Sequence, residues 1–362
     1  MKEVLVVYTW NTDPNSFGGI KTIIESYIEK EGVFETNGYT LNYFNYKPEL
    51  VGKYGPWGHV LYAIKQIIAL KKYLKKTRFD IVHIHTSRDF LFFKDMFIAR
   101  MVKRTFNIPV VITVHVGAAE TVFKKIGLFK GLLTSLHNKY VNKTLFLSKS
   151  IQRDFVKQGF HENRTGVLYN FHNLVPVLTS SVTEKEKGLR LIYVGAIHRE
   201  KGILDLLTAI NDIKDFPCHL DICGTLKDDG IKPIFERKIQ QLRGYVTCHG
   251  MVRGEEKTRL YEKADLLILP SYHEGFPMVI LEALQSKCAI ISTQVGATPE
   301  ILNEENAYWV AIKSPEQIKE AILFFYNNRG ILEEMKENNY KMSNYYSLDN
   351  HIKQLCGIYN NV

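Results

Sequence analysis

Two hydrophobic patterns alternate along the chain: short runs that are apolar on both faces, and longer segments whose apolar residues recur at helical spacing. The short runs are rich in β-branched residues, which is typical of buried strands in parallel sheets. They are Val4–Thr9, Ile81–His85, Val110–His115, Thr144–Ser148, Leu191–Val194, His219–Cys223, Val246–His249, Leu266–Leu269 and Ile290–Thr293. Helical spacing is shown by Val60, Leu61, Ile64, Ile67, Ile68 and Leu74. Alternating strands and helices predict an α/β fold with parallel sheets.

This α/β pattern runs through two cycles, which are separated by Asn173–Gly188. That stretch is rich in proline, serine and charged residues, as linkers are. The length of 362 residues, at about 150 residues per domain, also indicates two domains. We expect a doubly wound, Rossmann-like domain over residues 1–172, a second over residues 173–344, and a cleft between them. A final helix over residues 345–362 is expected to pack back on the first domain.

Charge is distributed unevenly along a chain of otherwise ordinary composition. Hydrophobic residues make up 45% and charged residues 23%, values that exclude a disordered chain and a small disulfide scaffold. The net charge is +9, but residues 1–180 carry 25 basic and 13 acidic side chains (+12), which leaves 22 and 25 (−3) for residues 181–362. The first half is therefore expected to face an anionic partner, such as nucleic acid, membrane lipid or a phosphorylated acceptor.

The cysteines and the N-terminus favour a cytoplasmic protein. The five cysteines form no CxxC pair, and we interpret them as buried thiols in a reducing compartment. They are Cys218, Cys223, Cys248, Cys288 and Cys356. The run Met1–Tyr8 lacks the longer apolar core of a signal peptide, and no uncharged run of about 18 apolar residues occurs. Any membrane contact is thus expected to be peripheral, at the inner face of the membrane.

The segment Ala264–Ala283 carries the strongest chemical signal. A buried strand ends at Pro270, a polar loop follows, and a helix starts near Pro277, because proline is favoured at the first helical position. Ligands of open α/β sheets bind at this edge, where a helix start offers free N–H groups to a phosphate. Glu274 precedes the helix and Glu282 lies about two turns inside it. The two carboxylates can hold hydroxyls of two sugar rings; alternatively, Glu274 caps the helix and Glu282 lies on its solvated face.

The spacing of this segment resembles a family signature. Glu274-Gly-Phe-Pro-x4-Glu282, preceded by Pro-Ser, closely resembles the E-x7-E motif of glycosyltransferase family 4 (group 1), retaining enzymes of the GT-B fold. Further segments are similar to family motifs and occur in family order over nearly the whole chain. They are Phe17–Ile20, Asp80–His85, Ile112–His115, Val194–Ile203, His249–Gly250 and Val295–Glu300. The resemblance implies a GT-B architecture, with two Rossmann-like domains facing across a cleft.

The resemblance also implies roles for individual residues. Lys201, Glu274 and His115 would be the catalytic residues, Lys201 as a cation for the donor diphosphate. The expected diphosphate contacts are Gly18, Gly19, Arg199, Lys201, Met278 and Val279. The donor sugar would contact Glu274, Gly275, Phe276 and Pro277, and the nucleoside Glu282, Gly224, Gly250 and Met251. His85 and His115 would face the acceptor; each histidine alone is also compatible with a purely structural role.

One position departs from the family pattern. The family often places arginine directly after the glycine that ends the Val194-Gly195 strand, and this chain has Ala196 there. Arg199 stands three residues later, and we hypothesise that it supplies the second cation for the diphosphate.

The implied reaction is transfer of a hexose or N-acetylhexosamine from a nucleotide-sugar to a glycan or lipid-linked acceptor, with retention of anomeric configuration. In this family the acceptor is thought to attack the face from which the diphosphate leaves, and a donor phosphate oxygen takes its proton. No Asp-x-Asp motif occurs, so no metal ion and no cofactor is expected. A UDP-sugar is expected from its frequency in the family, and the product would be a cell-surface polysaccharide. The alternatives are another GT-B enzyme, of the glycogen-synthase or phosphorylase kind, and a non-catalytic basic protein that binds membrane or nucleic acid.

The basic first half suggests a partner for its surface. Residues 121–144 contain five lysines and no acidic residue. Their apolar positions form one helical stripe, which either lies in an anionic membrane surface or packs into an ordinary core. The stripe consists of Val122, Ile126, Phe129, Leu133, Leu136 and Tyr140. Nucleic-acid binding is not expected, since the chain has no RNP-type aromatic motif, zinc finger or helix-turn-helix signal.

Overall fold

The chain forms two compact units, each built on a parallel sheet. The computed structural model describes residues 1–9, 19–46, 56–87, 90–116, 123, 127–172, 174 and 188–362. Unit 1 comprises Met1–Tyr169 with Leu348–Val362, and unit 2 comprises Asn170–Ser347. The borders expected after residues 172 and 344 lie a few residues from these divisions, and most of the expected linker lies outside the described residues.

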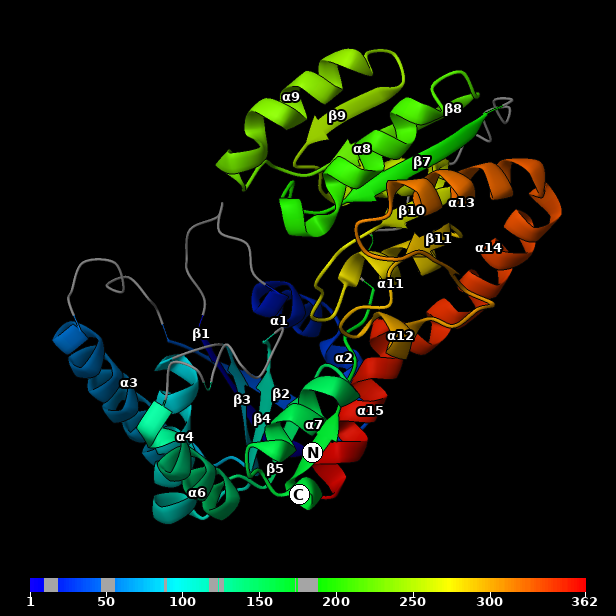
Figure 1. Cartoon of the computed structure of the whole chain (residues 1–362). Helices are drawn as coiled ribbons and strands as arrows, with labels where there is room; N and C mark the ends of the chain where they lie inside the picture. The colour runs from blue at the N-terminus through cyan, green and yellow to red at the C-terminus, as the bar shows by residue number, and fades with distance from the viewer. Residues whose placement is uncertain are drawn as a thin grey trace. The chain divides into compact units, whose positions relative to one another are not determined.

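Unit 1 contains a six-stranded parallel sheet of order β2-β1-β3-β4-β5-β6 (Figure 1). Its strands are β1 (Lys2–Thr9), β2 (Tyr39–Tyr46), β3 (Ile81–Thr86), β4 (Val110–Val114), β5 (Lys143–Phe146) and β6 (Thr165–Val167). Its helices are α1 (Gly19–Glu29), α2 (Glu31–Thr36), α3 (Pro56–Lys76), α4 (Phe90–Phe106), α6 (Lys130–Tyr140), α7 (Lys149–Lys157) and α15 (Leu348–Asn360), with short 3-10 turns η1 (Gly127–Phe129) and η2 (Glu162–Arg164).

Unit 2 repeats this architecture with the strand order β12-β11-β10-β7-β8-β9, again all parallel. Its strands are β7 (Leu189–Val194), β8 (Cys218–Cys223), β9 (Val246–Gly250), β10 (Leu266–Leu269), β11 (Ala289–Ser292) and β12 (Tyr308–Trp309). Its helices are α8 (Ile203–Asp212), α9 (Lys232–Gln241), α10 (Gly254–Lys263), α11 (Met278–Gln285), α12 (Thr298–Ile301), α13 (Pro315–Asn327) and α14 (Arg329–Ser343), with 3-10 turns η3 (Arg199–Lys201), η4 (Asp229–Ile231) and η5 (Asn344–Tyr346).

The predicted α/β class with two Rossmann-like sheets is confirmed. Every predicted strand occurs, with ends that shift by one or two residues. Three strands that the hydrophobic pattern did not predict, β2, β6 and β12, all lie at sheet edges. Edge strands are half exposed and carry polar or aromatic residues, so they do not produce a continuous apolar run.

Alternation along β3 divides its side chains between two environments. Val82 and Ile84 join the apolar core of unit 1, which also includes residues of α4, α6 and α7. His83 and His85 point to the opposite face, because successive side chains of a strand alternate. There His83 meets α15, where its Nδ1 lies 2.6 Å from the hydroxyl of Tyr359. The C-terminal helix therefore covers a polar face of the sheet.

Helix α15 is held on unit 1 by buried hydrogen bonds. The Tyr39 hydroxyl donates to Asn360 Oδ1 at 2.6 Å, and the Tyr27 hydroxyl lies 2.7 Å from Nε2 of His351. Nδ1 of His351 is 2.7 Å from the carbonyl oxygen of Tyr169. Because a carbonyl only accepts, Nδ1 of His351 carries the proton and Nε2 accepts from Tyr27. The neutral imidazole that this arrangement uses is favoured by burial, which lowers the pKa of His351 to about 4.

The apolar stripe within residues 121–144 packs into the core of unit 1. Leu133 and Leu136 are 0% and 5% exposed, and Tyr140 packs against the same core. Phe129 is exposed, and Val122 and Ile126 lie outside the described residues. The interpretation of this stripe as a lipid-facing surface is therefore wrong for its central residues, since α6 buries its apolar positions against α4 and the sheet.

All five cysteines are free thiols. Cys223, Cys288 and Cys356 are buried, as the sequence indicated, and burial raises the pKa of the Cys288 thiol to about 12. Cys218 is partly buried. Cys248 is exposed, so its prediction as a buried thiol was wrong; β9 is an edge strand and one of its faces is open.

Glycines let the loops at the carboxyl edge of the unit 2 sheet approach one another. Gly202, before α8, has a φ of +67°, and a Cβ there would lie 2.1 Å from the carbonyl oxygen of Pro270. A Cβ at Gly296 would lie 1.9 Å from the carbonyl oxygen of Glu274. The loops after β7, β10 and β11 can pack together only because these positions have no side chain.

Gly202→Ala should destabilise the protein by about 3 kcal/mol, because alanine adds both a backbone strain and a clash with Pro270. Urea unfolding followed by circular dichroism measures the change. The control is Gly330→Ala in α14, where no atom lies within 4 Å of the added Cβ, and which should be neutral or slightly stabilising. Equal midpoints for the two variants would contradict the close packing.

The histidines around α15 should make stability sensitive to mild acid. Burial lowers the pKa of His83 to about 3 and that of His351 to about 4. Neighbouring groups change these two pKa values by less than burial does. Below about pH 6.5 the unfolded chain binds protons that the folded chain does not, so stability is lost as the pH falls through 6.5 toward 4. The loss is up to about 1.4 kcal/mol per pH unit for each histidine.

His351→Gln isolates this effect, because glutamine can make both hydrogen bonds but does not titrate. The free energy of unfolding, measured between pH 7 and pH 4.5, should fall less steeply for this variant than for the wild type. Exposed His161, replaced by glutamine, is the control and should keep the wild-type slope. Identical slopes for all three proteins would show that His351 is not held neutral.

Candidate active site

The candidate active site lies where the strand order of unit 2 reverses. β7 pairs with β8 on one side and with β10 on the other. The chain therefore adds β8 and β9 on one side of β7 and later adds β10, β11 and β12 on the other side. The loops after β7 and β10 begin at the same edge because both strands are parallel. Open α/β sheets bind their ligands at such a point. The loop after β7 carries Lys201, and the loop after β10 carries Glu274.

Lys201 and Glu274 form an ion pair across this point. The Lys201 Nζ donates to Glu274 Oε1 at 2.8 Å, and the Ser271 hydroxyl donates to the same oxygen at 2.7 Å. The side chains are 31% and 10% exposed, respectively, so the pair is partly shielded from water. Within the described part of the chain no partner occupies Oε2 of Glu274. That oxygen is thus available to accept hydrogen bonds from hydroxyl groups.

Backbone contacts hold the Glu274 loop in place. The Tyr272 amide donates to the Glu200 carbonyl at 2.8 Å, and the Ala297 amide donates to the Gly275 carbonyl at 3.0 Å. Gly275, Phe276 and Pro277 complete the loop. Pro277 is the residue that precedes α11 rather than its first residue, so the helix starts one position later than predicted.

Helix α11 presents its N-terminus at this edge of the sheet. Its first residues are Met278 and Val279, whose amides have no partner within the helix because of helix geometry. Such amides, with the helix dipole, favour a phosphate. Both residues are partly exposed. The predicted diphosphate contacts Lys201, Met278 and Val279 thus come from the loop after β7 and the helix after β10.

Glu282 is buried rather than solvated. It is 5% exposed, and its carboxylate accepts a very short hydrogen bond from Lys257 and one of 3.0 Å from the Tyr261 hydroxyl. The interpretation of Glu282 as part of a solvated helix face is therefore excluded. Both carboxylate oxygens keep acceptor capacity, since each can take more than one hydrogen bond.

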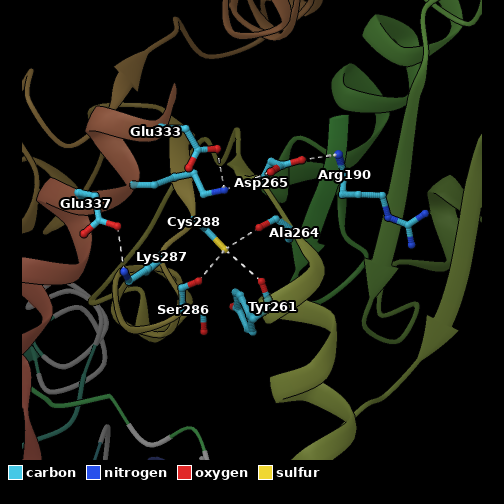
Figure 2. A network of polar contacts seen from close by, with 10 residues as sticks. Arg190, Tyr261, Ala264, Asp265, Ser286, Lys287, Cys288, Glu333 and Glu337 are labelled. Atoms are coloured by element: carbon cyan, nitrogen blue, oxygen red, sulfur yellow. Dashed lines mark hydrogen bonds and ion pairs between the residues drawn. The ribbon is translucent and has the colours of Figure 1, made fainter. Parts of the chain in front are cut away.

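A buried thiol fixes the helix that supplies these two partners. Cys288, just after α11, donates to the Tyr261 carbonyl at 3.3 Å and approaches the Ala264 carbonyl at 3.6 Å (Figure 2). These carbonyls belong to the end of α10, where the Tyr261 carbonyl also accepts from the Ala264 amide at 3.0 Å. Asp265, which follows, accepts from the Arg190 amide at 3.1 Å. The network anchors α10 against β7 and α11, and so positions Lys257 and Tyr261.

The expected nucleoside residues lie at the neighbouring strand ends. The Gly224 amide donates to the Gly250 carbonyl at 2.6 Å, and Met251 is 48% exposed. The pKa of the Cys223 thiol, at the end of β8, is raised to about 12 mainly by burial, and the Lys257 charge acts in the opposite direction. The Glu282 carboxylate accepts a hydrogen bond from the same lysine.

Arg199 shares the turn η3 with Lys201. It is exposed, and its charge acts on the Tyr272 hydroxyl, whose pKa is raised mainly by burial. Tyr272 belongs to the Glu274 loop. Ala196, which stands at the family's arginine position, accepts a hydrogen bond of 2.8 Å at its carbonyl from the Tyr193 hydroxyl. Arg199 is thus a cation beside the same loop that Lys201 contacts.

In unit 1 the two expected histidines lie against each other. His85 Nδ1 is 3.0 Å from His115 Nε2, and the rings are stacked. His85 is 3% exposed, so it does not offer an open surface to an acceptor. Burial lowers the pKa of His115 to about 3, and it is therefore neutral near pH 7. Gly19 begins α1, and Gly18 lies outside the described residues.

Three partners of the expected site residues were not found from the sequence. Ser271 could have been suspected, because it precedes Glu274 by three residues in the same loop. Lys257 and Tyr261 are four residues apart on one face of α10. That spacing alone does not show which helix they face. In the described part of the chain no group of three or more His, Cys, Asp or Glu side chains could hold a metal ion.

Comparison with known proteins relates the chain to sugar-transferring enzymes. Two family models, "Glycosyltransferase Family 4" and "Glycosyl transferases group 1", match residues 36–175 and 178–342. An uncharacterized glycosyltransferase of Methanocaldococcus jannaschii is 24% identical over 98% of this chain and 97% of its own length. The alpha-galactosylglucosyldiacylglycerol synthase of Streptococcus pneumoniae is 27% identical over 76% of this chain and 75% of its own.

A solved structure shows the same fold. HepE of Anabaena, crystallised in complex with UDP, matches with a TM-score of 0.76 and 14% identity, and the match covers 100% of both chains. Since the two family models together span most of the sequence and the fold agrees, the chain belongs to the group 1 glycosyltransferases of the family 4 type, with the GT-B fold.

Proposed function

We propose that this glycosyltransferase moves a hexose or N-acetylhexosamine from a UDP-sugar to a glycan or lipid-linked saccharide, with retention of anomeric configuration. The observation that carries the proposal is the Lys201–Glu274 pair beside the N-terminus of α11. HepE has been crystallised with UDP-glucose, and the relative from Streptococcus pneumoniae is a glycolipid synthase. These relatives support a UDP-sugar donor and a product in polysaccharide or glycolipid synthesis.

The donor would be held by groups of unit 2. Lys201 and the amides of Met278 and Val279 neutralise the diphosphate, and they stabilise the charge that develops on it as it leaves. Glu274 binds the distal hydroxyls of the donor sugar through Oε2, while Lys201 and Ser271 keep Oε1 in place. Glu282 accepts from the ribose hydroxyls, and Gly224, Gly250 and Met251 border the nucleoside.

The reaction is a displacement at the anomeric carbon. The bond from this carbon to the diphosphate oxygen breaks, and a bond to the acceptor oxygen forms on the same face of the sugar. The acceptor proton goes to an oxygen of the departing phosphate, and UDP leaves. Glu274 is not proposed as a nucleophile, because its Oε1 is engaged by Lys201 and its Oε2 is assigned to the distal hydroxyls of the donor sugar. The charge on the leaving group is met by protein cations, so we propose that no metal ion and no cofactor is needed.

Unit 1 would supply uncharged contacts to the reacting sugars. His115 is neutral near pH 7, so it serves as a hydrogen-bond partner for the donor sugar or acceptor rather than as a cation for the diphosphate. We propose that Gly18 and Gly19 let the chain approach the diphosphate closely. His85 acts through His115, which its ring contacts.

We place this reaction in the cytoplasm, where nucleotide-sugars are substrates, next to the inner face of the membrane. Among the helices of the described residues, none is long and apolar enough to cross a bilayer. The excess of basic residues in the first half favours contact with an anionic partner that carries the acceptor.

A panel of UDP-, GDP- and ADP-sugars tests donor binding directly. A donor at 100 times its Kd should stabilise the folded protein by about 2.7 kcal/mol and raise the melting temperature by several degrees. We expect this rise with UDP-sugars, its loss in Lys201→Met, and its retention in Lys214→Met, an exposed lysine after α8. No rise with any of the three nucleotides would contradict the proposal.

Substitution of the two cations distinguishes their roles. Lys201→Ala should abolish turnover, because it removes both the diphosphate contact and the partner of Glu274. Arg199→Ala should lower turnover about 100-fold, as loss of one transition-state donor does. Steady-state kinetics with the preferred donor measure both. If Arg199→Ala keeps near wild-type turnover while Lys201→Ala is inactive, Arg199 does not replace the family's arginine.

A further inference from the structure

Helix α3 exposes a stripe of large apolar side chains. Leu61, Ile64 and Ile68 are 61%, 49% and 49% exposed. Residues advance by about 100° around a helix, so positions 61, 64 and 68 fall within about 60° of one another. The opposite side of the helix is the one that packs on unit 1, through Ala63, Leu70 and Leu74. The helical spacing seen in the sequence thus combines two separate faces.

Lysines continue and flank this stripe. Lys72 and Lys75 lie on the same side of α3 further along, and Lys65, Lys71 and Lys76 lie next to it. All five are exposed, and the sequence of the helix contains no acidic residue. The outer face of α3 is thus apolar in its first half and cationic in its second half. A solvated helix normally presents polar residues on that face, so three neighbouring aliphatic side chains are unusual.

Neighbouring helices add residues of the same kind. α3 contacts α4, and α4 contacts α6 and carries Phe93, whose ring lies 6.1 Å from that of Phe129 in η1 (Figure 1). Phe129 and Leu132 are 62% and 44% exposed, and Lys130 and Lys139 lie in the same segment. Thus α3 and the η1–α6 segment, which both contact α4, each expose apolar and basic side chains.

The chemistry of this face selects one class of partner. A second copy packed on α3 in parallel would bring lysines against lysines, whereas in an antiparallel pair the lysines of each copy would face the aliphatic half of the other, so neither pairing neutralises the lysines. Nucleic acid would satisfy the lysines but leave the aliphatic side chains in water. A bilayer with anionic headgroups satisfies both, because lysines meet the lipid phosphates while Leu and Ile enter the boundary of the acyl chains.

We propose that the outer face of α3, centred on Leu61, Ile64, Ile68, Lys72 and Lys75, docks the protein on the surface of an anionic lipid bilayer. α3 lies along the membrane plane and does not cross it. This docking deepens the proposed function, since it would bring unit 1 to a membrane-carried acceptor. It depends on no donor or acceptor, so vesicle binding and sugar transfer can fail independently.

Sedimentation with lipid vesicles tests the docking. The probes are vesicles of phosphatidylcholine alone and of phosphatidylcholine mixed with phosphatidylglycerol, without any sugar substrate. The wild type should bind the anionic vesicles, bind the neutral ones at least tenfold more weakly, and dissociate in high salt. No binding to anionic vesicles overturns the proposal.

Two triple variants separate the contributions of the face. Leu61→Ser/Ile64→Ser/Ile68→Ser should weaken binding at least tenfold. Lys65→Gln/Lys72→Gln/Lys75→Gln should weaken it by about fivefold per lysine. These side chains are exposed, so the melting temperature and its rise with donor should be unchanged. If the lysine variant loses binding and the aliphatic variant does not, the contact is purely electrostatic and insertion of α3 is overturned.

Matched controls exclude effects of net charge and of general hydrophobicity. Lys214→Gln/Lys232→Gln/Lys263→Gln removes the same charge from exposed positions of unit 2, and Ile28→Ser removes a 47% exposed aliphatic side chain from α1. Both controls should bind like the wild type. If the controls lose vesicle binding as much as the α3 variants do, docking through this face is contradicted. If the wild type forms a concentration-dependent dimer that the aliphatic variant does not form, the face serves self-association instead.

Discussion

The ion pair between Lys201 and Glu274 is the contact on which the proposed active site depends. It joins the loops after β7 and β10, which are far apart in sequence but adjacent at the point where the strand order reverses. Ser271 shares the contact, and Gly202 and Gly296 allow the loops to come this close. Because one oxygen of Glu274 is used internally, the other can select a sugar hydroxyl. A structural contact and a binding site are thus combined in one side chain.

Charge has different roles in the two units. Unit 2 lies mostly in the half of the sequence with a net charge of −3, and on the proposed function a few cations suffice there, because Lys201, Lys257 and a helix N-terminus would lie around the donor. Unit 1 carries exposed lysines and arginines on helix faces, notably five lysines on α3, while its buried histidines are neutral. On the proposed function and docking, positive charge would thus meet a large anionic surface in one unit and a small ligand in the other.

The hydrophobic pattern predicts the buried strands well, because such strands are apolar on both faces. It does not predict β2, β6 and β12, which are half exposed at the sheet edges. The motifs place Glu274 and Lys201 correctly in the loops at one sheet edge, since the strand-loop-helix order is local. The contacts of Glu282 with Lys257 and Tyr261 depend on how α10 packs on α11, and the exposure of Leu61, Ile64 and Ile68 depends on the rotation of α3. Both are set by tertiary packing, so spacing alone could not predict them.

The central claim is that the carboxyl edge of the unit 2 sheet holds a nucleoside diphosphate. A crystal structure of the protein grown with UDP tests it most directly. We expect electron density for the diphosphate between Lys201 and the amides of Met278 and Val279, with the ribose hydroxyls on the Glu282 carboxylate. UDP bound elsewhere, with the Lys201–Glu274 pair and Glu282 untouched, would contradict it.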